Sequence, residues 1–289
     1  MSPKNQKSIL LIAGPTASGK SALAIAQAQA RGGVIINADS MQVYQELRII
    51  TARPSVEEEA QVPHKLFGHI RGAEDYSTAA WLSEAEHEIE ACWAADKLPI
   101  ICGGTGLYFM ALEQGLAKLP PIDPKIRDKW RNFYGDLHGE LEQRHADSAS
   151  RLNPADRQRI IRSLEVLEST GKPLIDWQKE AQQESKLQTA NIERLFMNSP
   201  RDELYARAEH RFDLMLERNA IEEVRALPNL HPAQPLMKAI GVPELLAHIK
   251  GELTLEEAKT KAKTATRNYI KRQMTWFRGQ MKSWANLDI

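Results

Sequence analysis

The sequence contains only two cysteines, Cys92 and Cys102. Two thiols are too few for a disulfide framework or for a structural zinc site, so neither device is expected to stabilise this chain. Cys102 lies inside an apolar run, and we expect both cysteines to be ordinary core residues.

Net charge is also absent, because 38 lysine and arginine residues balance 38 aspartate and glutamate residues. A nucleic-acid partner would therefore have to be bound by a local basic surface. No apolar run approaches the length of about 18 residues that a membrane-spanning helix requires, and residues 1–8 are polar, unlike a secretion signal. We expect a cytoplasmic protein with no membrane partner. Its 289 residues, of which 42% are hydrophobic, are enough for a large α/β core with an additional module, or for two domains.

What the sequence does contain is Gly14-Pro15-Thr16-Ala17-Ser18-Gly19-Lys20-Ser21, between apolar residues 9–13 and helix-favouring residues 22–26. A glycine-framed loop between a strand and a helix is a P-loop, a motif shared with ATP-binding proteins, whose backbone N–H groups and helix N-terminus bind phosphate. We expect Lys20 to add positive charge and Ser21 to ligate Mg²⁺. A glycine-rich turn without a ligand is the alternative.

A carboxylate, Asp39, ends the second predicted strand, residues 34–39. Doubly wound sheets bind their ligands at the carboxyl ends of strands, which favours a catalytic role for Asp39. Capping of a following helix explains the residue equally well.

The third predicted strand, residues 99–102, runs into Gly103-Gly104-Thr105-Gly106-Leu107-Tyr108. Its glycines indicate that the backbone approaches something closely, and Thr105 is the side chain of this turn able to hydrogen-bond a ligand. A tight turn without a ligand is the alternative. Before this strand, helical spacing over residues 77–96 predicts an apolar stripe of Leu82, Ala85, Ile89 and Trp93.

The composition changes at the proline-rich segment 119–124, a candidate domain boundary. From there to about residue 188 the chain is polar, helical and rich in arginine, with Ile160 predicted on a different helix face from Arg159 and Arg162. A strand at residues 192–197 returns the chain to the core.

Two helices are predicted near the C-terminus. The first, residues 201–216, has the apolar stripe Leu204, Ala208, Phe212 and Met215. The second begins at a capping box of Thr254 and Glu257 and is expected to bury Ala258, Ala262, Ala265 and Tyr269.

This last helix has no acidic residue from 259 to 282, and Trp276 and Phe277 stand among its basic residues. A surface of one sign favours phosphates and bases as partners, and a solvated basic helix is the alternative. The basic residues are Lys259, Lys261, Lys263, Arg267, Lys271, Arg272, Arg278 and Lys282.

A P-loop has two broad uses. The terminal phosphoryl group of a bound triphosphate can be transferred, or diphosphate can leave while a nucleophile attacks carbon. These residues by themselves do not decide between the two.

Taken in order, six segments resemble the signature of the bacterial tRNA dimethylallyltransferases, the IPP transferase family. They are the P-loop, Asn37 to Tyr44, Thr51 to Pro54, Gly103 to Tyr108, Arg159 to Val166 and Lys271 to Arg278. The resemblance covers nearly the whole chain, and only the P-loop is shared widely with other families.

The resemblance implies a P-loop NTPase-like, nucleoside-kinase-like parallel sheet flanked by helices, with an inserted helical domain that clasps the tRNA anticodon stem-loop. On this basis we expect a first part of the catalytic core at residues 1–119, the insertion at 120–189, and a second part of the core at 190–289. A monomer is expected.

The resemblance also implies the reaction, in which a dimethylallyl group passes from dimethylallyl diphosphate to the N6 amine of the adenosine 3′-adjacent to the anticodon. Asp39 would be the general base and Thr105 would lie near the leaving oxygen. The diphosphate, with Mg²⁺ at Ser21, would be bound by Gly14, Thr16, Ala17, Ser18, Gly19, Lys20, Ser21 and Arg211.

The tRNA would be contacted from the Asp39 segment, the insertion and the last helix, after the target base flips out of the loop. The expected contacts are Asp39, Ser40, Met41, Gln42, Thr105, Arg127, Gln158, Arg159, Ile160, Ile161, Arg162, Lys271, Arg272 and Arg278. In one departure from the family pattern, Gly241 is followed by Val242-Pro243-Glu244 instead of an aromatic and a basic residue.

Three other functions remain compatible with these residues. An adenylate isopentenyltransferase acting on free nucleotide would need neither an insertion nor a basic last helix. A P-loop small-molecule kinase would turn over ATP through Lys20, and a regulatory RNA-binding protein would bind tRNA without prenyl transfer.

Overall fold

The computed structural model describes residues 7–181, 186–228 and 230–288. Residues 1–6, at the polar start of the chain, and residues 182–185, within the predicted insertion, lie outside the described part. The chain divides into two compact units, the first formed by residues 1–110 and 187–289 and the second by residues 111–186. The second unit begins ahead of the proline-rich segment, whereas we placed the insertion at 120–189.

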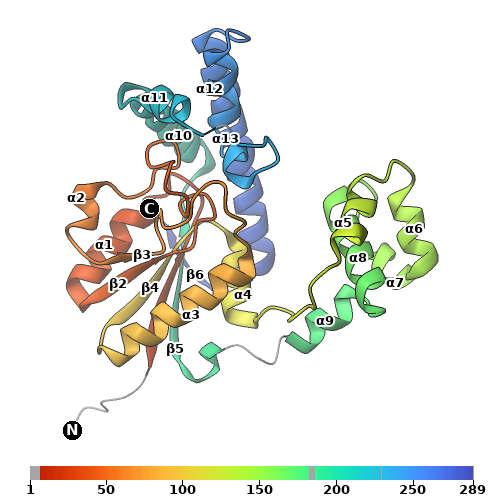
Figure 1. Ribbon diagram of the computed structural model, residues 1–289. Coiled ribbons are helices and arrows are strands. Elements are labelled where there is room, and N and C mark those ends of the chain that lie inside the picture. The colour runs from red at the N-terminus through yellow and green to blue at the C-terminus, as the bar shows by residue number, and fades with distance from the viewer. Residues whose placement is uncertain (1–6, 182–185, 229, 289) are drawn as a thin grey trace. The chain divides into compact units, whose positions relative to one another are not determined.

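The first unit is built on a six-stranded sheet in the order β3-β2-β4-β1-β5-β6, with every pair of neighbours parallel (Figure 1). Parallel strands are covered on both faces, which explains why the central strands are continuous apolar runs. The strands are β1 Ser8–Ala13, β2 Gly33–Asn37, β3 His64–Lys65, β4 Leu98–Gly103, β5 Asn191–Asn198 and β6 Ala285–Asp288. The predicted fold class, a parallel α/β sheet flanked by helices, is confirmed.

The strand order places three chemically distinct segments at one edge of the sheet. β1 lies between β4 and β5, and β4 lies between β2 and β1. The P-loop after β1, Asp39 after β2 and the glycine turn after β4 therefore leave the carboxyl ends of neighbouring strands. This is the edge at which α/β sheets bind ligands.

Helices cover the sheet and extend beyond its carboxyl edge (Figure 1). Those of the first unit, with the two helices at its boundaries, are α1 Lys20–Arg31, α2 Val56–Glu59, α3 Thr78–Ala94, α4 Gly106–Gln114, η1 Lys186–Thr189, α10 Arg201–Glu217, α11 Ala220–Arg225, η2 Pro235–Lys238, α12 Val242–Ile249 and α13 Leu255–Gln280. The buried side of α1 packs with Leu10, Ile12, Ile35 and Cys102. Both cysteines are buried, as predicted.

The apolar stripe predicted for α3 is wrong, because the buried face of the helix is displaced from it by a small rotation about the helix axis. The helix buries Trp81, Ala85, Ile89 and Cys92, whereas Leu82 and Trp93 are only partly buried. Trp81 belongs inside because its indole N–H donates to the Asn37 carbonyl at 2.7 Å and its ring stacks on Tyr108 at 4.1 Å.

The stripe predicted for α10 is fully buried, and the capping box at the start of α13 is present. The inner face of α13 was predicted less well. Ala265 and Tyr269 are partly buried, and this face continues through Ile270, Gln273, Met274 and Phe277. Phe277 packs against Phe109 and Phe196 in the core, so it is not available to a ligand.

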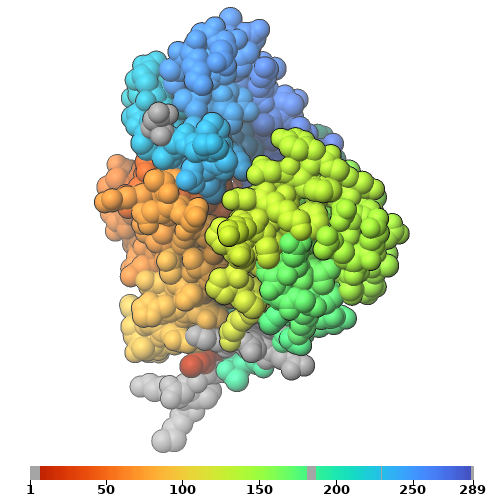
Figure 2. Space-filling model, turned by 45° about the vertical axis from the view of Figure 1, so that its right-hand side comes forward, coloured from red at the N-terminus to blue at the C-terminus, as the bar shows by residue number. Residues whose placement is uncertain are grey.

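The second unit is a small helical body with its own core (Figure 2, yellow-green to green). Its helices are α5 Pro124–Arg131, α6 Leu137–Arg144, α7 Ala146–Ser150, α8 Arg157–Thr170 and α9 Leu174–Ala181. Trp130, Leu141, Ile160 and Leu164 are at most 1% exposed in this core. Ile160 therefore presents no surface to RNA, and its inclusion among the tRNA contacts is corrected.

Within the described residues, no helix combines the length and the apolar character needed to cross a membrane.

The close approach of β4 to the chain after β2 can be tested at Gly103. A Cβ at this position would lie 2.1 Å from the backbone of Ala38, so Gly103→Ala is expected to lower the free energy of unfolding by about 3 kcal/mol or more. The matched change Gly279→Ala, in α13 with open space around the new Cβ, should raise it by up to about 1 kcal/mol. Urea unfolding of both variants measures the difference, and equal stabilities would refute the close approach.

Candidate active site

The loop between β1 and α1 has the backbone shape of a phosphate-binding loop. Ala17 and Gly19 have positive φ angles of 64° and 83°, and no side chain caps the start of α1. A Cβ at Gly14 would lie 2.8 Å from both Met197 and Ser18, which explains the first glycine of the motif. The uncapped N–H groups and the helix N-terminus offer an anion-binding site.

Two cations lie against this loop, and neither forms an ion pair with an acidic residue in the described part of the chain. Lys20 Nζ donates to the Pro15 carbonyl at 3.4 Å, and Arg211 donates through Nη2 to Thr16 Oγ1. Arg211 Nε is buried and has no partner among the described residues. Burial lowers the pKa of both side chains, while the nearby charge of Asp39 raises it. Both side chains are partly buried, and a desolvated cation with an unsatisfied donor is costly, so an anion bound here would stabilise the charged forms.

Asp39 is held by a local turn and not by a helix. Its Oδ1 accepts from the Met41 N–H at 2.9 Å, and no helix occupies residues 40–55, all of which are described. The helix-capping alternative is therefore wrong.

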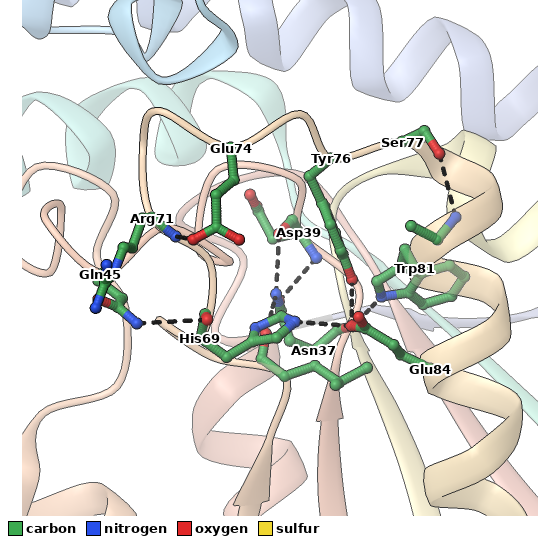
Figure 3. A network of polar contacts seen from close by, with 12 residues as sticks. Asn37, Asp39, Gln45, His69, Arg71, Glu74, Tyr76, Ser77, Trp81 and Glu84 are labelled. Atoms are coloured by element: carbon green, nitrogen blue, oxygen red, sulfur yellow. Dashed lines mark hydrogen bonds and ion pairs between the residues drawn. The ribbon is translucent and has the colours of Figure 1, made fainter. Parts of the chain in front are cut away.

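Asn37 fixes the backbone that carries Asp39 (Figure 3). Its Oδ1 accepts from the Asp39 N–H at 2.8 Å, and its Nδ2 donates to the carbonyls of Asp39 and Leu66, both at 3.0 Å. Asn37 is fully buried. Sequence analysis assigned it no role, although an amide at the buried end of an apolar strand is a signal that could have been followed.

A second layer of polar contacts lies beside Asn37 (Figure 3). Trp81 donates to the Asn37 carbonyl, while Tyr76 OH and His69 Nε2 both contact Glu84 Oε2 at 2.8 Å. Burial, followed by the hydrogen bond to Glu84, raises the pKa of Tyr76 far above its ordinary value. Tyr76 therefore stays protonated and keeps its hydrogen bond to the carboxylate.

Thr105 faces the segment that carries Asp39. Its N–H donates to the Ala38 carbonyl at 3.1 Å, and its Oγ1 accepts from the Ser40 N–H at 2.9 Å. A Cβ on Gly104 would lie 3.7 Å from Asp39 Oδ2. The structure thus brings the glycine turn, Thr105 and Asp39 together, as expected from the sequence. The close approaches that require Gly103, Gly104 and Gly106 are to other parts of the chain itself.

Two cavities meet at Arg211, which lines both. The smaller, of about 260 Å³, is lined by Thr16, Asp39 and Arg272, with apolar walls that include Phe212 and Met215. The larger, of about 690 Å³, is lined by Lys20, Ser21, Arg48, Arg53, Arg211 and Arg218. The smaller cavity therefore contains Asp39 and apolar walls together with Arg211, Lys238 and Arg272, whereas the larger contains Lys20 and four arginines together with Glu57 and Glu58.

The loop of residues 45–55, which borders both cavities, is fixed by a residue that sequence analysis missed. Glu223, in α11, accepts from the N–H groups of Arg48 and Ile49 through Oε1 at 2.8 and 2.7 Å, and from Ile50 through Oε2 at 2.8 Å. Gln42 supports the same loop by donating through Nε2 to the carbonyls of Thr51 and Ala52. The amide donors of Gln42 are thus already used within the protein.

The chain after Gly241 serves the fold. Gly241 has φ +99°, and a Cβ there would lie 2.6 Å from Ile50. Val242 is fully buried, and Glu244 accepts from the Gly241 N–H at 2.9 Å. The departure from the family pattern therefore provides a core residue and a cap for α12.

The basic helix α13 is only partly free of acidic neighbours. Lys259 and Lys263 pair with Asp213, and Arg267 pairs with Glu209, so α10 provides acidic partners for three basic residues of its N-terminal half. The expectation of an uncompensated basic face is corrected for these three residues. The exposed residues Lys271, Arg272 and Arg278 lie in the second half.

In the second unit, the predicted RNA contacts other than Ile160 reach the surface to different degrees. Gln158 and Arg159 are exposed, while Ile161 and Arg162 are partly buried. Arg159 pairs with Asp156, and Arg162 pairs with Glu165. Arg127 has a buried Nε without a partner in the described part of the chain.

The donor set near the P-loop fits a magnesium ion that is held mainly by substrate. No group of three or more His, Cys, Asp or Glu residues in the described segments could hold a metal. The exposed Ser21 lines the cation-rich cavity beside Lys20. Mg²⁺ commonly takes one or two protein ligands, with phosphate oxygens and water completing its shell, so a single hydroxyl is compatible with it.

Comparison with protein families gives two matches. The family model described as IPP transferase matches residues 42–280, and the model described as isopentenyl transferase matches residues 7–67. The first covers most of the chain, and the second covers the P-loop and the Asp39 segment.

Known relatives agree with the first match. The chain is 48% identical over 279 residues to the tRNA dimethylallyltransferase of Nitrobacter hamburgensis, covering 94% of this chain and 88% of that protein. It is 31% identical to a solved tRNA isopentenylpyrophosphate transferase of Bacillus halodurans, with a TM-score of 0.69 over 98% of this chain and 91% of that one. A eukaryotic dimethylallyltransferase, solved in the act of modifying tRNA, is 30% identical with a TM-score of 0.82, over 98% of this chain and 74% of that one.

The role of Glu223 in fixing the cavity loop can be tested by Glu223→Gln. Three backbone N–H groups would lose a charged acceptor, so the free energy of unfolding is expected to fall by about 2 kcal/mol. The neighbouring change Glu222→Gln removes a carboxylate that pairs with Arg225 on the surface and should cost less than about 0.5 kcal/mol. Urea denaturation compares the two, and a Glu223→Gln variant as stable as the control would contradict the assigned role.

Proposed function

The chain belongs to the IPP transferase family and is an enzyme that transfers a dimethylallyl group to tRNA, and we propose that its donor is dimethylallyl diphosphate and its acceptor the N6 amine of the adenosine 3′-adjacent to the anticodon. The observation that carries the proposal is the pair of cavities that meet at Arg211, one with Asp39 beside apolar walls and the other with Lys20 and Ser21 of the P-loop beside several arginines.

This arrangement suits a displacement at carbon. The amine attacks C1 of the dimethylallyl group, a C–N bond forms, and the C–O bond to diphosphate breaks. Nucleophile and leaving group must lie on opposite sides of the carbon, and the assignment of Asp39 and Lys20 to different cavities is compatible with this requirement. The apolar walls of the smaller cavity, including Phe212 and Met215, suit the hydrocarbon.

Diphosphate leaves with developing negative charge, which is stabilised by Lys20, Arg211 and the N-terminus of α1. Lys20 and Arg211 are partly buried, and Arg211 is hydrogen-bonded to Thr16, so these cations are positioned before the diphosphate binds. Bound Mg²⁺, held by Ser21 and the diphosphate oxygens, would supply further neutralisation of that charge.

Asp39 accepts the proton that the amine loses. The lone pair of an adenine amine is delocalised into the ring, so removal of its proton during attack assists the reaction. Thr105, held beside Ser40 by its hydroxyl, is assigned the role of contacting the leaving oxygen.

The target base must leave the anticodon loop to reach Asp39. Lys271, Arg272 and Arg278 offer phosphate contacts in the first unit, and the second unit offers exposed Gln158 and Arg159. We assign the second unit to clasping the anticodon stem-loop, with the enzyme acting as a monomer.

The proposal is tested by incubating the protein and Mg²⁺ with radiolabelled dimethylallyl diphosphate and either unmodified tRNA or AMP. Label confined to the adenosine next to the anticodon is the expected result. Label in AMP would favour the adenylate isopentenyltransferase. ATP hydrolysis without label would favour a kinase, and tight tRNA binding without label a regulatory role.

Asp39→Asn tests the base. The amide keeps the shape of the side chain but cannot take up the proton, so kcat is expected to fall about 10²- to 10⁴-fold with tRNA affinity unchanged. Single-turnover rates and filter binding measure the two quantities. The same substitution at the exposed Asp96 serves as the control. A parallel loss of tRNA binding would remove Asp39 from the role of base.

Lys271→Gln with Arg272→Gln tests the basic surface. Each lost phosphate contact is expected to reduce the slope of log K against log salt by about 1, so the double variant should lose about 2. Lys259→Gln with Lys263→Gln is the matched control, because these lysines already pair with Asp213 and Glu256. Titrations of tRNA at several salt concentrations decide the matter, and an unchanged slope would place the RNA elsewhere.

A further inference from the structure

One residue of the last sequence motif has no part in the chemistry described so far. Gln273, in α13, is only 5% exposed, although most of its neighbours in the motif are basic or aromatic. Its Oε1 accepts from the Thr16 N–H at 3.0 Å, and its Nε2 donates to the Gly104 carbonyl at 2.9 Å. One amide therefore connects the P-loop with the glycine turn, across 257 and 169 residues of sequence.

Both contacts end beside proposed catalytic groups. Thr16 Oγ1 accepts from Arg211, and Gly104 directly precedes Thr105. A Cβ on Gly104 would lie 2.4 Å from Gln273 Nε2 and 3.7 Å from Asp39 Oδ2, which shows how closely the amide and the carboxylate flank this glycine. A change in the position of the Gln273 amide would therefore shift the diphosphate side and the amine side of the site relative to each other.

The same helix carries the basic residues assigned to tRNA. Lys271 and Arg272 directly precede Gln273, and Arg272 lines the smaller cavity. Trp276, one turn further on, packs so closely on the glycine turn that a Cβ on Gly106 would lie 2.2 Å from its ring. The helix is therefore fixed to the glycine turn at two successive points, next to its exposed cations.

We propose that Gln273 is a positioning residue for the transfer reaction, which sets the distance between the P-loop and the Asp39–Thr105 side of the site while it holds the tRNA-facing helix against both. The inference rests on the proposed function. Gln273 touches no reacting atom, so its contribution is to the alignment of donor and acceptor, where a displacement of about 1 Å can cost about 10²-fold in rate.

An amide is required because one contact needs an acceptor and the other a donor. Methionine has a similar length but neither group. Glutamate retains the acceptor but, when ionised, presents a second oxygen to the Gly104 carbonyl. A protonated glutamic acid restores the pattern, because its carbonyl accepts from Thr16 and its O–H donates to Gly104.

The test compares Gln273→Met and Gln273→Glu with the matched control Gln280→Met, an exposed position at the end of α13. Transfer of labelled dimethylallyl to tRNA is followed from about pH 6 to about pH 8, a range in which a buried glutamate with a raised pKa changes its protonation state. Circular dichroism melting monitors folding.

The expected result for Gln273→Met is a kcat about 10- to 100-fold below wild type, with KM for tRNA and for the donor within about threefold. Gln273→Glu should show a similar loss at the high-pH end, and its rate relative to wild type should rise at least about fivefold toward the low-pH end. A side chain that only stabilises the fold would give no such pH-dependent recovery, and the control should match wild type throughout.

If Gln273→Met fails to fold, the pH profile of Gln273→Glu alone decides, and a flat ratio overturns the inference. A folded Gln273→Met variant with kcat within about twofold of wild type overturns it too, and leaves the proposed function standing. A wild-type protein that labels no tRNA defeats the proposed function itself, and the inference with it.

Discussion

The structure of this site depends on two cations, Lys20 and Arg211, that are partly buried beside a phosphate-binding loop and form no ion pair among the described residues. Desolvation lowers the pKa of each, and Arg211 keeps a buried donor without a partner in the described structure. Such groups are tolerated where a ligand completes them. An anion bound at this point would complete the P-loop, the cations of the larger cavity and Arg211, which α10 brings to the loop.

The second constraint is how closely the backbone segments approach one another at the carboxyl edge of the sheet. Gly103 lies against the backbone of Ala38, and Thr105 is hydrogen-bonded to both Ala38 and Ser40. Asn37 holds the backbone of Asp39 by accepting a hydrogen bond from its N–H. Because these contacts are between backbones or short polar groups, the carboxylate is held at the site without occupying the space that a substrate needs.

The long helix α13 connects these parts with the proposed RNA surface. Its buried face reaches the P-loop and the glycine turn through Gln273 and Trp276, and its exposed face carries Lys271, Arg272 and Arg278. Under the proposed function, the helix assigned to tRNA binding also holds the groups assigned to the diphosphate donor.

The sequence by itself determined the parallel α/β class, the P-loop, the family and the segments that carry Asp39 and Thr105. Those features are local, since they depend on apolar runs, glycine positions and residue order, and the strand ends were bound to meet at one edge of a parallel sheet.

Helix faces were predicted where the stripe was regular, as in α10, and were misplaced by a small rotation in α3, where a hydrogen bond from Trp81 decided which side was buried. Only the tertiary structure showed that Ile160 is core, that Asp213 and Glu209 pair with three basic residues of α13, a helix with no acid from residue 259 onward, and that Glu223 and Gln273 fix the site. Each of these facts is a contact between residues far apart in the chain, and a single sequence contains no signal for which distant partner a side chain will meet.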